Sequence, residues 1–140
     1  MKKLMPVVFI LLCFSARSQS SDTIKVNTDS VYTKPDTEAQ FPEGETKWNE
    51  YVKKTIEANI KTLVDDPKSN GVCTVNFIVD RDGSILAAVA VNMQGSELAR
   101  IFVKAILKGP KWIPATVNGI PVKSLRKQKA IFKSAPKETF

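Results

Sequence analysis

Acidic side chains are the residues of this 140-residue chain whose types and spacing come closest to a chemical site. Asp80 and Asp82 precede Gly83 as in part of a calcium loop, but an EF-hand needs a further oxygen ligand before the glycine and a distal bidentate Glu, and the sequence has neither. The carboxyl pairs Asp65-Asp66 and Glu43-Glu45 fall at expected turns or helix ends, with no neighbouring groups suited to general acid–base catalysis. We therefore predict no metal, no cofactor and no enzymatic activity.

Histidine is absent from the chain, and cysteine occurs twice. Without imidazole there is no Ser-His-Asp or Cys-His nucleophile system and no His-ligated zinc site. Cys13 lies in an N-terminal apolar run, whereas Cys73 lies in a strand-like run where a small buried hydrophobe is typical. Loss of the N-terminus would leave Cys73 as the only thiol, so we expect no intramolecular disulfide.

The N-terminus predicts an export signal over residues 1–20. Lys2 and Lys3 precede an apolar run from Leu4 to Phe14, and small residues follow it. The run is shorter than the roughly 20 residues of a membrane-spanning helix, so we expect a cleaved signal and a periplasmic protein in preference to an inner-membrane anchor. Residues 21–40 are rich in Ser, Thr, Asp, Lys and Pro and predict a flexible polar segment.

A helix over about residues 45–63 is expected next, because apolar residues recur every four positions from Trp48 to Ile60. Residues 72–79 and 84–91 are two β-prone runs, and the Asp-Gly turn chemistry between them predicts an antiparallel hairpin.

A second helix begins after the N-cap residue Ser96 and ends before Gly109. Asn118-Gly119 is a turn, and residues 121–133 form a last strand-like stretch. This order predicts an α+β fold in which a small antiparallel sheet of about three strands packs against two helices. We place the domain at residues 41–134, followed by a tail at 135–140.

The ordered motifs of this domain resemble the C-terminal domain family of the periplasmic energy-transducing protein TonB. The matching strings are Phe41 to Glu45, Gly71-Val72, Val75 to Ile85, Lys111 to Ala115, Asn118-Gly119, Pro121-Val122 and Ile131-Phe132. The motif and core positions that carry the resemblance are Phe41, Pro42, Trp48, Phe77, Asp82, Gly83, Trp112, Pro114, Asn118 and Gly119.

The resemblance implies a non-enzymatic domain whose last strand leaves an open sheet edge. In such domains the plug of an outer-membrane TonB-dependent receptor donates an extended segment that pairs along this edge, in energy transduction for transmembrane nutrient transport. The implied partner-binding residues are Lys123, Leu125, Arg126, Lys127, Lys129 and Ile131. Inner-membrane motor proteins, another TonB-like chain and a homodimer through the open edge are further partners that the resemblance allows.

Positive charge is concentrated toward the C-terminus: residues 101–140 hold 9 of the 21 Lys and Arg residues and 1 of the 14 acidic residues. Cations in the last strand either protect an exposed edge from aggregation or favour an acidic partner. This charge leaves open a basic binder of anionic envelope components. A soluble envelope scaffold or competitor that has lost energy coupling also stays open, because a cleaved signal and a short polar segment stand where the transducer has an anchor and a long spacer. Export argues against a nucleic-acid partner.

Overall fold

The computed structural model of the protein describes residues 26–135. The expected signal at residues 1–20, including Cys13, and all but the first residue of the expected tail at 135–140 lie outside the described residues. Between residues 26 and 135, the helices are too short or too polar to cross a bilayer.

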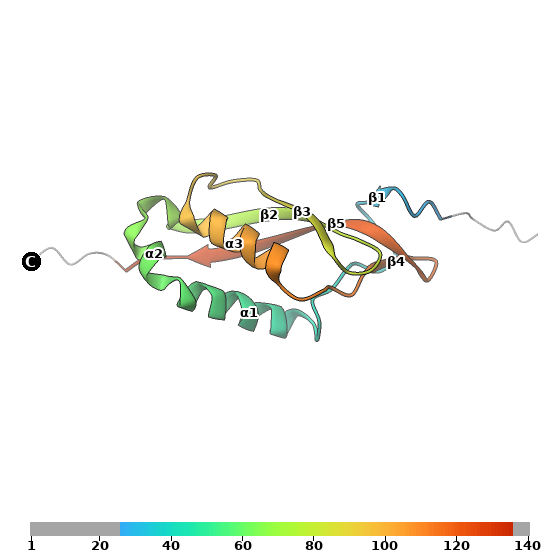
Figure 1. The fold of residues 1–140 in the computed structure, drawn as a ribbon, viewed down its shortest axis with the longest axis horizontal. Coiled ribbons are helices and arrows are strands. Elements are labelled where there is room, and N and C mark those ends of the chain that lie inside the picture. Colours follow the sequence, from blue (N-terminus) through green and yellow to red (C-terminus); the bar gives the residue numbers. More distant parts are fainter. Residues whose placement is uncertain (1–25, 136–140) are drawn as a thin grey trace, which may run out of the picture.

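A mixed β-sheet forms one layer of the fold (Figure 1). Among the described residues its strands are β1 (Val31–Tyr32), β2 (Gly71–Val79), β3 (Ile85–Ala90), β4 (Ala115–Val117) and β5 (Ile120–Phe132). The strand order is β1-β5-β2-β3, with β4 paired to the start of β5. The α+β class is confirmed, but the expectation of about three antiparallel strands is wrong, because β1 joins the sheet in parallel to β5.

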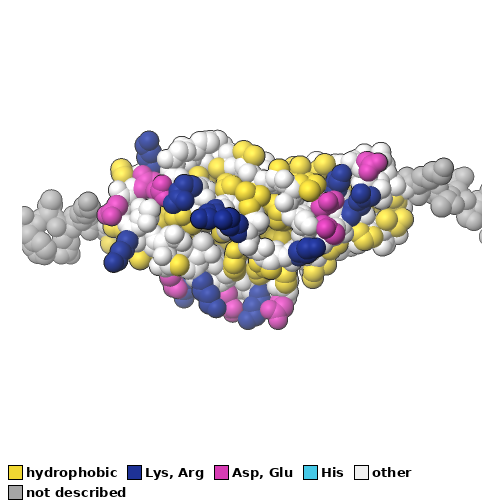
Figure 2. Space-filling view, viewed as in Figure 1, with side chains coloured by type: hydrophobic (Ala, Val, Ile, Leu, Met, Phe, Trp, Pro, Cys, Tyr) yellow, Lys and Arg dark blue, Asp and Glu magenta, His cyan; other side chains and the backbone are white. Residues whose placement is uncertain are grey.

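Three α-helices and a short 3₁₀ turn make up the helical part of the described chain, where two helices were expected. They are α1 (Glu45–Ala58), α2 (Ile60–Asp65), α3 (Glu97–Lys108) and the 3₁₀ turn η1 (Pro67–Ser69). The helix predicted over residues 45–63 is broken at Asn59, whose φ of −113° and ψ of 14° leave the helical region. Charged side chains are scattered over the face shown in Figure 2, and hydrophobic side chains are exposed between them.

The predicted hairpin of β2 and β3 is confirmed, and its turn rests on the chain before β4. Gly83 has a φ of 86°, and its carbonyl oxygen accepts a hydrogen bond from the Trp112 amide at 2.9 Å. A Cβ atom on Gly83 would lie 1.9 Å from the Trp112 carbonyl oxygen. The Asp-Gly and Trp-x-Pro motifs therefore form one contact, in which only glycine fits the turn.

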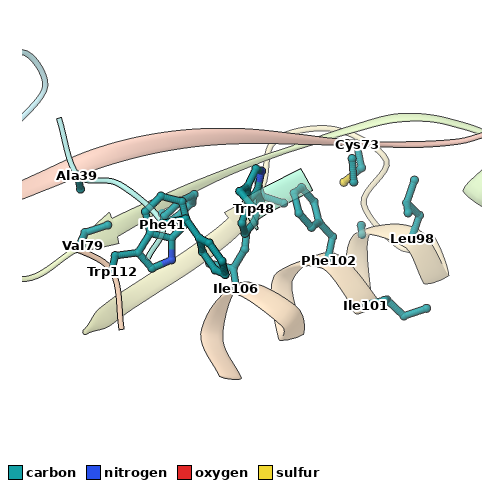
Figure 3. Packing of buried hydrophobic residues seen from close by; sticks show 14 of the residues in the cluster. Ala39, Phe41, Trp48, Cys73, Val79, Leu98, Ile101, Phe102, Ile106 and Trp112 are labelled. Atoms are coloured by element: carbon teal, nitrogen blue, oxygen red, sulfur yellow. The ribbon is translucent and has the colours of Figure 1, made fainter. Parts of the chain in front are cut away.

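The helices cover one face of the sheet, and an aromatic cluster fills the space between the layers (Figure 3). Trp48 of α1 stands 5.4 Å from both Phe41 and Trp112, measured between ring centroids, and Trp112 lies 5.0 Å from Phe77 of β2. All four side chains are buried. The expected core role of these motif residues is thus confirmed, while Pro42 and Pro114 are half-buried at the rim.

Residues 31–40, expected to belong to a flexible polar segment, pack onto the fold. Ala39 is fully buried, and Gln40 and Ile113 exchange two backbone hydrogen bonds of 2.9 and 2.7 Å. Thr37 and Thr116 form a similar pair. The folded part of the chain therefore starts N-terminal to Phe41, because this polar segment supplies backbone partners to the chain around β4.

Candidate partner-binding edge of β5

The outer edge of β5 is the place where the sequence predicted partner binding. The Val91 amide donates to the Thr74 carbonyl at 2.9 Å. Because backbone groups alternate in direction along a strand, the N–H and C=O groups of even-numbered residues of β2 bond to β3, and those of odd-numbered residues bond to β5. Their partners are the even-numbered residues of β5, as in the pair Phe77–Arg126. The N–H and C=O groups of the odd-numbered residues of β5, including Lys127, therefore point outward along the edge.

Side chains of β5 alternate between the two faces of the sheet. Of the six predicted residues, five lie on the face away from the helices: Lys123, Leu125, Lys127, Lys129 and Ile131. These five also have the outward-pointing backbone groups. Arg126 lies on the other face, where its side chain is only 18% exposed. The structure therefore brings five predicted residues together and separates Arg126 from them.

Two hollows lie between β5 and α1 on the helix-covered face. One, of about 430 Å³, is lined by Val52 and Ile56 of α1 and by residues 129–131 of β5. The other, of about 250 Å³, is lined by Trp48, Arg126 and residues near Phe41. An added strand at this edge would therefore meet apolar side chains in one hollow and a cation with aromatic rings in the other.

Gln128 and Ala130 belong to the candidate site but were not among the predicted site residues. Gln128 lines the smaller hollow and Ala130 the larger one. The period of two along residues 122–132 is the signal that could have separated this face from the lysine face. Charge alone groups the cations of both faces, because it ignores the alternation of side chains along the strand.

The start of this edge is already occupied by the protein's own N-terminal segment. Val31 pairs with Lys123 and Tyr32 with Ser124, in parallel. Within residues 26–135, β1 is the strand found along the outer edge of β5, and residues 125–132 continue beyond it. An extended partner would therefore add after β1, along eight residues of β5.

Electrostatics along this edge are dominated by cations. Arg126 Nη1 donates to the Glu38 carboxylate, which anchors the N-terminal segment to β5. Arg126 Nε and Ser124 Oγ are buried and make no hydrogen bond to any described residue. Lys127 and Lys129 are exposed on the open face. Unpaired positive charge therefore lies on the open face, where it favours carboxylates in a partner, whereas the charge of Arg126 on the helix-covered face is already balanced by Glu38.

The remaining predicted motif residues have structural positions. Asn118 (φ 50°) and Gly119 (φ 75°) form the tight turn between β4 and β5, as left-handed residues do in hairpin turns. Hydrogen bonds from the Ser84 side chain and backbone lower the pKa of Asp82, and Lys111 contributes from 3.7 Å. The Asp82 carboxylate therefore shapes the turn next to Gly83.

Possible metal ligands and the Cys73 thiol are further features of the part of the chain that the structure describes. It brings no three His, Cys, Asp or Glu side chains together in a group able to hold a metal ion. Cys73 is fully buried in β2, and burial raises the pKa of its thiol. A protonated, enclosed thiol packs as a small hydrophobic group.

Comparisons of this chain with protein-family models, curated proteins and solved structures return no match.

Proposed function

We propose that the protein is a non-enzymatic, TonB-like periplasmic domain that binds an extended segment of an outer-membrane receptor by strand addition to β5. The free stretch of β5 at residues 125–132 carries this proposal. Its outward backbone groups give an added strand hydrogen bonds of the kind that supply affinity in strand addition. The motif resemblance from Phe41 to Phe132 supports the choice of partner.

The hollows beside α1 support side-chain recognition in the same mode. Alternate residues of an added strand point to the same face of the sheet, so every second side chain would face Val52 and Ile56 or the Trp48–Arg126 hollow. The intervening side chains would lie beside Lys127 and Lys129. A segment that carries apolar residues on one face and at least one carboxylate on the other is the best fit.

The test is a titration of the labelled protein with synthetic receptor-plug peptides, followed by backbone NMR. We expect shifts confined to residues 125–132 and to the facing side of α1. Lys127→Pro removes an outward N–H without breaking a bond to β2, so it should weaken binding at least tenfold. Lys127→Ala retains this N–H and is the matched control. Absence of binding at millimolar peptide, or equal losses in both variants, would reject the proposal.

A second candidate function, binding of anionic envelope components, is favoured by the open face of β5. Lys123, Lys127 and Lys129 share this face with the apolar side chains of Leu125 and Ile131. Such binding to phosphate-bearing surfaces must weaken steeply as salt rises, whereas strand addition depends mainly on backbone hydrogen bonds. Co-sedimentation with anionic vesicles from 50 to 300 mM salt, a range of about sixfold, separates the two functions.

A further inference from the structure

The opposite edge of the sheet carries a further groove, separated from β5 by β2 in the strand order. The groove has a volume of about 610 Å³ and lies between α3 and β3. Its β3 wall is formed by residues 88–90, and its α3 wall includes Val103 and Leu107. Leu107 is 46% exposed, so the groove presents apolar surface to solvent.

Alanines at the helix-facing positions of β3 explain why this groove exists. Ala88 pairs with Phe77 and Ala90 with Val75, so all four side chains face α3. Large side chains on β2 fill the space beneath α3, whereas the two methyl groups on β3 leave its outer part open. The groove is therefore a consequence of residue size at the sheet edge.

The backbone of β3 beside this groove has an unpaired side. Because the Val91 amide bonds to the Thr74 carbonyl, the alternation of an antiparallel ladder points the N–H and C=O groups of Ala88 and Ala90 away from β2. Within the described chain β2 is the strand neighbour of β3, and Gln94 Nε2 donates to the Ala90 carbonyl at 3.1 Å. The Ala88 groups and the Ala90 N–H remain directed toward the groove.

Positive charge lines the helical rim of the groove. Arg100, Lys104 and Lys108 follow one another at intervals of four residues along α3, and Figure 2 shows Lys and Arg side chains across this face beside hydrophobic ones. Glu97 is the acidic lining residue, and its carboxylate already pairs with Arg100 at 2.5 Å. The two lysines make no ion pair with another described residue, so the rim has an excess of positive charge.

We infer that the α3–β3 groove is a second docking site, which binds an extended acidic segment of a partner protein by strand addition to β3. The rim from Arg100 to Lys108 is about 12 Å long at the helical rise, and four residues of an extended strand span about 13 Å. Residues two positions apart in a strand point to the same face. An acidic, an apolar and a second acidic residue at such spacing would therefore place carboxylates near the two ends of the rim and an apolar side chain against the groove between them. This inference does not depend on the proposed role of β5.

The test uses a capped decapeptide with Leu near its centre, Glu two positions before and after it, and Thr elsewhere. Titration into the labelled full chain should shift the backbone signals of residues 88–90 and 103–108. Two matched peptides, one with Lys in place of both Glu residues and one with Ser in place of Leu, should bind at least tenfold more weakly. Shifts that appear at residues 125–132 instead, or no preference among the three peptides, would overturn the inference.

Variants of the protein make the test independent of peptide design. The double variant Lys104→Glu, Lys108→Glu reverses the rim charge and should weaken binding of the acidic peptide at least tenfold. The control variant Lys54→Glu, Lys61→Glu changes the net charge of the protein by the same amount, but on α1 and α2, and should leave binding unchanged. Ala88→Pro removes an outward N–H and should act like the rim variant. Equal affinity in the rim and control variants would refute the site even if Ala88→Pro fails to fold.

Discussion

Gly83 and Trp112 meet through their backbones, and this contact should dominate the effect of a substitution at the turn. In Gly83→Ala the new Cβ would lie 1.9 Å from the Trp112 carbonyl oxygen, at a φ of +86°. We expect a loss of about 3 kcal/mol or more in the free energy of unfolding, because either the turn or the Trp-x-Pro segment must move. Urea unfolding followed by Trp fluorescence measures the change.

Gly95→Ala is the matched control for this prediction. Gly95 has a similar φ of +81°, but a Cβ there would have no atom of the described residues within 4 Å. Its substitution should cost only the left-handed backbone conformation, about 1–2 kcal/mol. Losses of equal size in the two variants would show that the contact with Trp112 adds nothing.

Asp66 links the 3₁₀ turn to the N-terminus of α3. Its Oδ2 accepts hydrogen bonds from Ser69 Oγ at 2.6 Å and from the Glu97 amide at 2.7 Å, and Ser69 Oγ accepts from the Leu98 amide at 2.9 Å. The hydrogen bond from Ser69, followed by that from Glu97, lowers the pKa of Asp66 from its usual 3.8. The carboxylate is therefore more stable as an anion in the folded protein.

The pH dependence of stability follows from this direction. Because the folded pKa lies below the unfolded value, the contribution of Asp66 is complete above about pH 4 and is lost as pH falls through the folded pKa. Asp66→Asn should remove this part of the acid loss, and Ser69→Ala should reduce it. Urea unfolding at intervals between pH 6 and pH 2 measures the slope, and an unchanged slope in both variants contradicts the prediction.

At the scale of elements, residue patterns predicted those parts of the fold whose contacts join residues close together in the sequence. The β2–β3 hairpin and the Ser96-capped α3 follow from turn residues and from a cap whose Oγ accepts the Ala99 amide at 3.1 Å. The break at Asn59 escaped detection because the apolar period continues from α1 into α2. The pairing of β1 with β5 escaped it because two residues carry no period and their partners lie about ninety positions away.

The strand that carries the candidate site could be predicted from the sequence, but the geometry of the site could not. Positive charge and the family resemblance located β5, but they could not assign its side chains to faces or reveal the hollows beside α1. The α3–β3 groove depends on small side chains at Ala88 and Ala90, and alanine gives no periodic signal in a strand. Pocket geometry arises from packing between elements that are distant in the sequence, and local residue patterns carry no information about it.

The segment at residues 31–40 is expected to behave as a strap whose attachment controls access to β5. Thr37→Pro removes the amide that donates to the Thr116 carbonyl at 3.1 Å, so it should speed hydrogen exchange at the Thr116 amide. If β1 then leaves its pairing with Lys123 and Ser124, the stretch of β5 open to an added peptide lengthens, and peptide binding should strengthen. Thr37→Ala retains the amide and serves as the control. Faster exchange without any gain in peptide affinity would show that the strap does not limit access to the edge.

At the scale of the whole molecule, both long helices pack on one face of the sheet, and nothing in residues 26–135 covers the other face. That face exposes Val89 and Ile131, at 62% and 59%, beside Lys127 and Lys129. Apolar surface next to an open strand edge favours association of copies, whereas lysines on both copies repel one another. The formal net charge of +7 also favours repulsion between copies. Solubility of the monomer should therefore depend on where the lysines lie and not only on their number.

The double variant Lys127→Thr, Lys129→Thr tests this dependence, because threonine retains strand propensity while both charges are lost. We expect it to form dimers or larger species in sedimentation velocity runs at concentrations where the parent chain is monomeric, and added salt should shift the parent chain in the same direction by screening. Lys54→Thr, Lys61→Thr removes equal charge from the helical layer and should leave the monomer unchanged. Equal association of both double variants would show that net charge alone governs solubility. Association of neither would show that the open face does not need lysines to prevent association of copies, so that these lysines are free to serve partner binding.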